Sequence, residues 1–249
     1  MNDAFAGLIQ TSKPQSSALY LTETLVDISE RPNFLARLSG DEYRQVRAVG
    51  REMKFGQQTE IFSQGERHDG IYVIESGNVR TYYLGPSGRE LTLAYWTPGH
   101  FVGGPEIFGG GRHMWSATAM SDCRLLHLRG DHLQQLMKVL PGLAAGLVEG
   151  LVFKGKCYSA LLQMLGTRSV LQRLAQLLLT LCELDGREAA GKIVIDRSLT
   201  HEELANMVGA TRQWVTASID RFQKQSLLKV IDRRIVILDR DRLERLAEC

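Results

Sequence analysis

The sequence has few cysteines, and none of them are close together. Its 249 residues include only Cys123, Cys157, Cys182 and Cys249, without a Cys-x-x-Cys pair. Zinc ribbons and dithiol redox motifs both need such pairs, so this spacing argues against them. Sparse, scattered cysteines fit a reducing compartment, and we therefore expect a cytoplasmic protein.

Long apolar runs are also missing. No uninterrupted apolar stretch approaches the roughly 18 residues that a membrane-spanning helix needs, so we expect no membrane partner. Residues 1–17 contain neither a basic leader nor a compact apolar segment, and this argues against a secretory signal. With 44% hydrophobic and 23% charged residues, the composition is that of a folded globular protein and not of a disordered chain.

The chain contains no familiar catalytic motif. Gly-x-Ser-x-Gly, His-Glu-x-x-His and the phosphate-cradling Gly-x-x-x-x-Gly-Lys-[Ser/Thr] are all absent. A metal enzyme of the cupin type needs His and carboxylate ligands clustered on neighbouring strands. The nearest candidates, His100, Glu106 and His113, fall in turn or loop segments. We expect no catalytic residues, no resident metal and no enzymatic activity.

The net charge of +2 conceals an uneven distribution. Residues 1–166 carry 16 basic and 16 acidic side chains, whereas residues 210–234 carry six basic and two acidic ones. A basic surface attracts phosphate, although a short one is more often only a solvated face. Charge alone therefore indicates nucleic-acid binding only weakly.

The first half of the chain predicts an antiparallel β-roll over residues 39–140, after an extension over residues 1–38. Ser39 and Glu42 form a capping box that predicts a helix to about Val49. Short β-rich runs separated by turn signals then predict a barrel or jelly roll. These runs cover residues 60–62, 70–74, 79–84, 91–96, 116–120 and 124–128.

A long helix is predicted over residues 141–166, with Pro141 in its first turn. Apolar or small residues recur along it at alternating steps of four and three, as in a coiled-coil seam. The seam consists of Ala144, Val148, Leu151, Gly155, Tyr158, Leu162 and Leu165. Such a stripe fits packing on the protein's own core or a homodimer interface. A helix of about 25 residues, roughly 37 Å, is long for this chain and favours the homodimer.

The region over residues 167–249 predicts a winged helix-turn-helix. A helix over about 168–184, a loop over 185–191 and a strand over 192–196 precede a second capping box, Thr200 with Glu203. Gly209 suits the tight turn between two helices. The following helix runs from Arg212 to about Gln225, and a hairpin with a basic tip at residues 232–234 completes the wing. The fold class is therefore α+β.

The second helix of this unit is expected to enter the major groove of double-stranded DNA. Its base contacts are predicted as Arg212 to guanine, Gln213 to adenine, and Thr216, which also lies near the phosphates. The predicted phosphate contacts are Thr200, Thr211, Lys224, Arg233 and Arg234. Trp214 fits either the domain core or stacking on the sugar. A dimer would read a near-palindrome with half-sites roughly 34 Å apart.

The order of β-roll, long helix and winged helix resembles the cyclic-AMP receptor protein/FNR (CRP/FNR) family of bacterial transcription regulators. The matching segments are residues 70–80, 85–91, 204–216 and 221–224. The resemblance implies a sensing roll, a transmitting helix, a habit of activation, and a polymerase contact from the loop over residues 186–191. It also gives Arg212 the guanine contact. Gln213 replaces the usual Glu and Ala217 a second Arg, so a different operator is expected.

The resemblance also locates an effector pocket, but with altered residues. Members that bind cyclic nucleotides use a Gly-Glu-Leu run and an Arg-Ser pair. Here Gly104 replaces the Glu, and Met114 and Trp115 replace the Arg-Ser pair. We expect no cyclic-AMP binding but a small apolar or aromatic effector, or none, with Tyr158 coupling the pocket to the seam. The expected pocket residues are Gly104, Arg112, Met114, Trp115, Tyr158, Ser159 and Leu162.

Three other interpretations remain open. Haem binding would use one or more of the histidines in or near the roll, although no cofactor is expected; these are His68, His100, His113, His127 and His132. Thiol sensing would use Cys123 or Cys157. An iron–sulfur cluster is disfavoured because residues 1–122 contain no cysteine. A ligand-binding module without DNA affinity is the alternative from another functional class.

Overall fold

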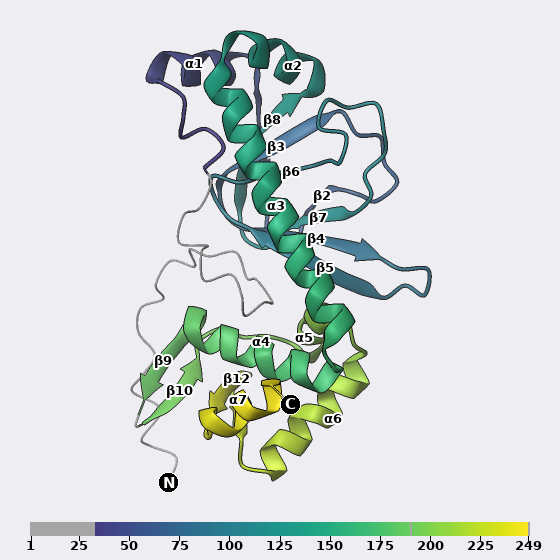
Figure 1. Ribbon diagram of the computed structural model, residues 1–249, viewed down its shortest axis with the longest axis vertical. Helices are drawn as coiled ribbons and strands as arrows, with labels where there is room; N and C mark the ends of the chain where they lie inside the picture. Colours follow the sequence, from purple (N-terminus) through teal and green to yellow (C-terminus); the bar gives the residue numbers. More distant parts are fainter. Residues whose placement is uncertain (1–32, 190, 249) are drawn as a thin grey trace.

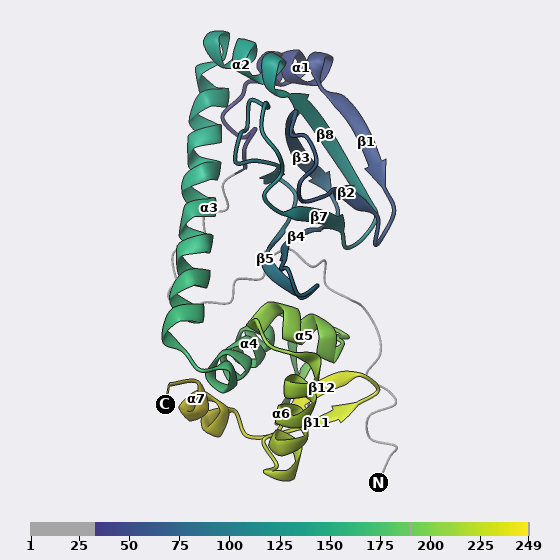
Figure 2. The ribbon, with the colours of Figure 1, turned by 90° about the vertical axis from the view of Figure 1, so that its right-hand side faces the viewer.

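A computed structural model describes residues 33–189 and 191–248. A β-roll and a C-terminal helical domain are joined by the long helix α3 (Pro141–Thr167), which runs down one side of the roll (Figures 1 and 2). The predicted α+β class is confirmed. Most of the expected N-terminal extension, up to residue 32, lies outside the described residues.

The β-roll consists of two four-stranded antiparallel sheets. The first has the order β1 (Arg51–Phe55), β8 (Cys123–Arg129), β3 (Gly70–Ser76), β6 (Phe101–Val102). The second has the order β2 (Glu60–Phe62), β7 (Ser116–Ala119), β4 (Val79–Leu84), β5 (Glu90–Trp96). Their facing residues, among them Phe62, Ile74, Trp96, Val102 and Leu125, form one buried cluster. The β-rich runs of the sequence did not predict β1 and β6, which lie at the two edges of the first sheet.

Two short helices cover one end of the roll (Figure 2). Helix α1 (Gly40–Val49) begins with the predicted capping box: the Ser39 hydroxyl accepts from the Glu42 amide, and the Glu42 carboxylate accepts from the Ser39 amide at 2.7 Å. Helix α2 (Gly130–Val139) leads directly into α3. Pro141 occupies the first turn of α3, where its missing N–H costs no hydrogen bond.

Helix α3 has two different apolar faces. The inner face packs on the roll and on the C-terminal domain through Leu143, Leu147, Phe153, Cys157, Ala160, Leu161 and Met164. On the outer face, Val148, Leu151, Val152 and Leu162 are 58%, 41%, 54% and 71% exposed. The chain therefore leaves an apolar stripe on α3 uncovered along several turns.

The C-terminal domain combines four helices with a four-stranded sheet. The helices are α4 (Val170–Asp185), α5 (His201–Val208), α6 (Arg212–Lys224) and α7 (Arg240–Glu248). The sheet has the order β11 (Leu228–Ile231), β12 (Arg234–Ile237), β10 (Lys192–Ile195), β9 (Gly186–Ala189). The prediction of a loop over residues 185–191 is therefore wrong for Gly186–Ala189, which form β9. Its polar residues look like a loop because an edge strand turns such side chains to solvent.

The roll and the C-terminal domain share a packed boundary. Tyr95 of β5 is buried within the core of the C-terminal domain, and Leu93 and Met120 pack against that core. The Glu90 carboxylate accepts hydrogen bonds from Arg80 at 2.6 Å and from Asn206 of α5 at 3.3 Å. One end of β5 therefore contacts the first helix of the helix-turn-helix directly.

Candidate functional site

Helices α5 and α6 form the predicted helix-turn-helix. Thr200 and Glu203 make the capping box at the start of α5. Gly209 ends α5 with φ 65°, a left-handed conformation that favours glycine. Thr211 then caps α6 by accepting a hydrogen bond from the Trp214 amide at 3.2 Å. These local signals fix both the length and the sharpness of the turn.

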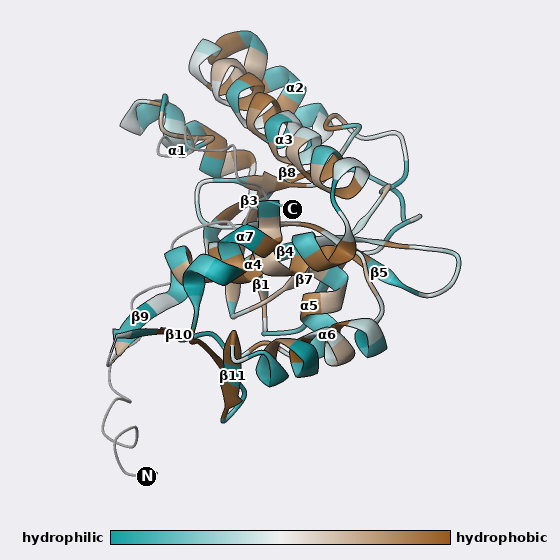
Figure 3. Cartoon of the chain, turned by 60° about the horizontal axis from the view of Figure 1, so that its bottom comes forward, coloured by the Kyte–Doolittle hydropathy of each residue, from teal (hydrophilic) through white to brown (hydrophobic). Residues whose placement is uncertain are grey.

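One side of α6 is buried and the other faces solvent. Val215, Ile219 and Phe222 are at most 1% exposed and anchor the helix in the domain core. The exposed residues are Arg212, Gln213, Ala217, Asp220, Arg221 and Lys224. Figure 3 shows the resulting change between hydrophilic and hydrophobic residues along α6. The expected base-reading residues Arg212 and Gln213 thus lie on an accessible face at the positive N-terminal end of a helix.

The threonines of the helix-turn-helix differ in their free hydrogen-bonding capacity. Thr211 uses its oxygen as an acceptor, so its hydroxyl hydrogen stays available for a phosphate. The Thr216 hydroxyl donates to the Arg212 carbonyl at 2.9 Å and lies 2.8 Å from His201 Nδ1. The Thr200 hydroxyl donates to Glu203 at 2.9 Å. Thr200 and Thr216 therefore serve the local structure in this conformation.

Trp214, for which the sequence left two roles open, packs partly buried against the domain core. Its ring therefore belongs to the folding core in this structure. The backbone N–H of Trp214 donates to the Thr211 side chain, and this hydrogen bond fixes the first turn of α6, from which the ring extends. Stacking on a sugar would require the ring to leave that packing.

The wing is a tight hairpin with a basic tip. Asp232 and Arg233 form its two-residue turn with φ 49° and 61°, and Ile231 pairs with Arg234 across it. Positive φ at both positions is typical of a type I′ turn, which suits the twist of a hairpin. Arg233 and Lys229 are exposed, whereas Arg234 Nε lies 3.5 Å from Asp196 Oδ1. Arg233 thus carries the less compensated charge.

On the sensor side, Trp115 and Tyr158 lie together between the roll and α3. Their ring centroids are 5.8 Å apart, and Trp96 meets Tyr158 edge-on at 6.4 Å. The Tyr158 hydroxyl is buried and has no hydrogen-bond partner among the described residues. Burial, reinforced by the nearby Cys157, raises the pKa of Tyr158. A buried hydroxyl without a partner is costly, and a ligand group that bonds to it would recover that cost.

The other expected pocket residues do not gather around this pair. Arg112 turns away and donates to the Gly65 carbonyl at 2.6 Å. Met114 and Leu162 are 59% and 71% exposed. Ser159 is also exposed, on α3, whereas Gly104 is buried after β6. Within one chain, only Trp115 and Tyr158 of the expected set line a common interior.

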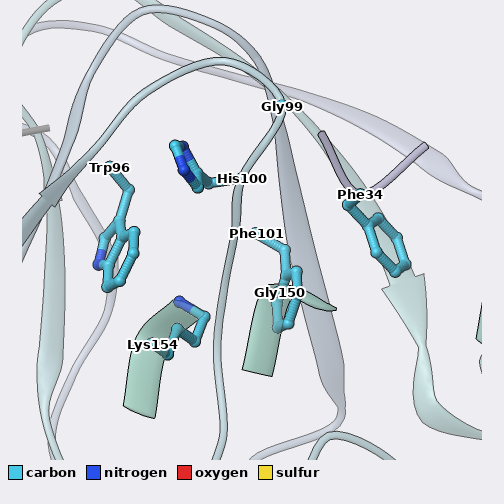
Figure 4. A pocket seen from close by; sticks show the side chains of 7 residues that line it. All are labelled: Phe34, Trp96, Gly99, His100, Phe101, Gly150 and Lys154. Carbon is cyan, nitrogen blue, oxygen red and sulfur yellow. The ribbon is translucent and has the colours of Figure 1, made fainter. Parts of the chain in front are cut away.

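A separate small cavity of about 10 Å³, room for about one water molecule, lies nearby, lined by Phe34, Trp96, Gly99, His100, Phe101, Gly150 and Lys154 (Figure 4). Lys154 is only 8% exposed, and its Nζ lies 3.6 Å from the centroid of the Trp96 ring. Burial lowers the pKa of Lys154 to about 7, slightly opposed by the charge of Cys157. Sequence reasoning missed this lysine, because a charged residue on an amphipathic helix is normally solvated.

Comparison with known proteins agrees with this geometry. Residues 52–139 match the family described as "Cyclic nucleotide-binding domain", and residues 172–246 match the "Crp-like helix-turn-helix domain". The chain is 30% identical over 197 residues to the "Transcriptional regulator LdrP" of Thermus thermophilus, covering 77% of this chain and 94% of that protein.

The chain belongs to the CRP/FNR family of transcription regulators. A solved CRP/FNR-family regulator from Thermus thermophilus is 30% identical, with a TM-score of 0.61 over 80% of this chain and 99% of that one. The "CRP-like cAMP-activated global transcriptional regulator" of Mycobacterium tuberculosis is 29% identical over 75% of this chain and 84% of that protein. A mutant of CooA from Carboxydothermus hydrogenoformans shares the fold, with a TM-score of 0.70 at 23% identity over 88% and 97%.

As a CRP/FNR-family member, the protein is a DNA-binding transcription regulator with an effector-binding domain, and not an enzyme. Regulators of this family bind DNA as dimers. None of the helices in the described part of the chain is both long and apolar enough to cross a bilayer.

The histidines of this CRP/FNR-family roll are largely engaged in ring stacks. His113 stacks on Phe62 at 3.9 Å and meets His68 at 4.4 Å, while His127 Nε2 lies 3.1 Å from Asp69. Burial lowers the pKa of His68, and burial together with His68 lowers that of His113 to about 4. Among residues 33–189 and 191–248, no three His, Cys, Asp or Glu side chains converge on a metal-sized site.

Two further findings bear on the alternative sensing chemistries. Burial raises the pKa of the Cys123 thiol, which is 2% exposed. Such a thiol is a poor nucleophile, so it does not favour thiol sensing. The cavity beside His100, at about 10 Å³, holds about one water molecule and has no room for a haem.

Proposed function

We propose that this regulator binds a near-palindromic operator as a homodimer and reads its bases with the N-terminal end of α6. The single observation that carries the proposal is the exposed polar face of α6, which begins with Arg212 and Gln213. A guanidinium there can donate two hydrogen bonds to guanine O6 and N7. Thr211, Lys224 and Arg233 supply phosphate contacts that set position and salt dependence. Thr216, Thr200 and Arg234 can contact DNA only after leaving their partners in this structure, which are the Arg212 carbonyl, Glu203 and Asp196.

The exposed stripe of α3 supports the dimer. Val148, Leu151, Val152 and Leu162 recur on one face of the helix and remain exposed in the single chain. Apolar residues at such spacing bury well against a second helix related by a two-fold axis. Tyr158 and Leu165 of the predicted seam pack partly into the chain's own cores. The seam therefore centres on the exposed residues, with Val152 and Ser159 added to it.

The effector is proposed to be other than cyclic AMP. Met114 and Trp115 stand where a cyclic phosphate would need a cation and a hydroxyl donor. The Trp115–Tyr158 interior offers instead apolar ring surfaces and one unpaired hydroxyl. A small aromatic molecule with a single hydrogen-bonding group matches that chemistry. Tyr158 would then couple effector binding to the packing of α3, and so to the spacing of the two α6 helices.

A contact with RNA polymerase is proposed for the hairpin of β9 and β10, over residues 186–195. Strand β9 is the edge strand of the C-terminal sheet, and β9 and β10 lie on the opposite side of the C-terminal domain from α6 (Figure 1). A partner bound there leaves the DNA-reading face free. The haem and thiol alternatives stay secondary, because His68, His113 and Cys123 are buried and engaged.

Selection of bound DNA from a random pool, on purified protein without added ligand, tests the DNA-reading proposal. An enriched palindrome with half-sites roughly 34 Å apart is the expected result. Enrichment should not change when cyclic AMP is added. A protein without salt-dependent DNA affinity would instead be a ligand-binding module of another functional class.

The dimer is tested separately with Leu162→Glu, which places a charge in the exposed stripe. Sedimentation at micromolar concentration should show a dimer for the wild type and a monomer for the variant. Lys156→Glu, at an exposed position of the same helix outside the stripe, is the matched control and should stay dimeric. Equal dimerisation of all three proteins would place the interface elsewhere.

A further inference from the structure

The C-terminal domain is connected to the exposed stripe of α3 through a short joint. Arg168 and Ser169 lie between the end of α3 and the start of α4, and both are extended, with φ −116° and ψ 141° for Arg168 and φ −64° and ψ 157° for Ser169. Across this joint, Arg173 of α4 donates to the Leu165 carbonyl at 3.2 Å. A few residues at the end of an element are enough for a hinge. The direction of α6 relative to the stripe therefore also depends on what holds the domain against the roll.

Apolar contacts hold the turn of the helix-turn-helix against β5 and the end of α3. A Cβ placed on Gly209 would lie 3.4 Å from Leu91 Cδ1 of β5 and 3.2 Å from Leu165 Cδ2 of α3. Tyr95 of β5 is buried in the core of the same domain. Hydrophobic contact is non-directional. These side chains therefore keep the two surfaces together but permit small displacements along the boundary.

Four polar side chains at this boundary supply directional bonds, and we call them the clasp: Asn206 of α5, Glu90 and Thr92 of β5, and Arg80 of β4. Asn206 is 7% exposed and donates to Glu90 Oε2 at 3.3 Å, where β5 lies beside α5 (Figure 2). Arg80 donates to the same oxygen at 2.6 Å and to Thr92 Oγ1 at 2.9 Å. A hydrogen bond tolerates only a narrow range of distance and angle. The clasp thus fixes α5 on the strand, and the tight turn at Gly209 makes α6 move with α5.

The position of α6 decides which operators a dimer can read. One base pair more or less between two half-sites changes their separation by about 3.4 Å and rotates one half-site by roughly 34° about the DNA axis. Both recognition helices can follow this change only if the C-terminal domains move relative to α3. The clasp resists that movement.

We propose that Glu90 and Asn206 determine specificity without touching DNA, because the clasp restricts the dimer to one spacing of half-sites. This inference rests on the proposed function, since it assumes a homodimer that reads a near-palindrome. Without the clasp, each C-terminal domain can adjust to the DNA. The range of accepted spacings then widens, while the bases read by Arg212 and Gln213 stay the same.

The test uses the operator selected with the wild type, and duplexes in which one base pair is inserted or deleted at its centre. Competition binding compares full-length wild type, Glu90→Ala, Asn206→Ala and the double variant. Each single variant should reduce the preference for the selected spacing by about tenfold, the lower end of what a hydrogen bond to a charged group contributes. The double variant should show no larger effect than either single one, because both changes break the same hydrogen bond.

Glu60→Ala is the matched control. Glu60 is exposed on β2, at the opposite edge of the same sheet from β5, so this variant should keep the wild-type preference. A variant that had only lost stability would bind all duplexes less well, and the ratio of their affinities would not change. Clasp variants with the wild-type ratio would overturn this inference and leave the proposed function intact. A wild type that selects no palindrome would overturn both.

Discussion

Replacing Lys154 by methionine should stabilise the protein, and by an amount that depends on pH. Methionine has a similar length and fills the same space beside Trp96 and Phe101 without a charge. The wild type must either bury an ammonium group or release its proton on folding. Burying an unpaired charge is among the more costly events in a protein interior, because the interior solvates the charge poorly.

The magnitude follows from the pKa of Lys154. Folding lowers this pKa from 10.5 to about 7, and each pKa unit corresponds to about 1.4 kcal/mol. The upper bound is therefore roughly 5 kcal/mol. Attraction between the ammonium group and the Trp96 ring, 3.6 Å away, offsets about 2 kcal/mol of that cost. We expect a change of about 3 kcal/mol over the titration range.

The sign is set by where each state holds the proton. Below pH 7 both the folded and the unfolded chain are protonated at Lys154, so the wild type bears the full cost. Between pH 7 and pH 10.5 the unfolded chain keeps a proton that the folded chain has lost, and wild-type stability rises with pH. The advantage of Lys154→Met is therefore largest at pH 6 and smallest near pH 10.

Urea unfolding of both proteins at equal concentration, at each pH from 6 to 10, measures this difference. Lys156→Met is the matched control and should show a small difference that does not vary with pH. If the free-energy difference between Lys154→Met and the wild type stays constant within about 0.5 kcal/mol over this range, the amine remains charged in the folded protein. The account of a desolvated lysine would then be refuted.

Three further predictions concern DNA and the sensor interior. Arg212→Ala should cost about 1–3 kcal/mol of operator binding and relax selection at one base pair, as measured by competition with single-base variants; unchanged preference would remove its assigned role. Arg233→Ala should weaken all sequences alike and reduce the slope of log affinity against log salt by about one. Tyr158→Phe removes a buried, unpaired hydroxyl and should raise the free energy of unfolding by about 1 kcal/mol without ligand. A destabilised Tyr158→Phe would mean that the hydroxyl has a partner.

Local signals in the sequence were sufficient where the structure depends on near neighbours. The capping boxes at Ser39 and Thr200, the left-handed Gly209 and the first-turn Pro141 all lie where the pattern predicts. Each is satisfied by hydrogen bonds or backbone angles within a few residues. The bounds of α6 could therefore be predicted closely: the helix was expected from Arg212 to about Gln225, and it runs from Arg212 to Lys224.

Features that depend on distant contacts were harder to predict. The two-residue strand β6 exists because β3 pairs with it, and no period can be read from two residues. On α3, apolar residues occupy two faces, so the spacing alone does not show which face meets the roll. Tyr158 turned inward and Val152 outward. Lys154 escaped notice because the rings beside it come from β5 and β6, far away in the sequence.

Strand β5 connects the sensor interior to the DNA-binding domain within two consecutive residues. Side chains alternate along a strand, so Trp96 faces the core of the roll and the Lys154 cavity, while Tyr95 lies buried in the core of the C-terminal domain. A ligand that moved the Trp96 ring would have to shift or twist this strand, because packed interiors yield little. Tyr95 would then move against α5 and α6. Effector binding can change DNA affinity only by stabilising one position of β5 over the other. Strand β5 contacts both domains through adjacent residues, so it connects them more directly than the seam of α3 does.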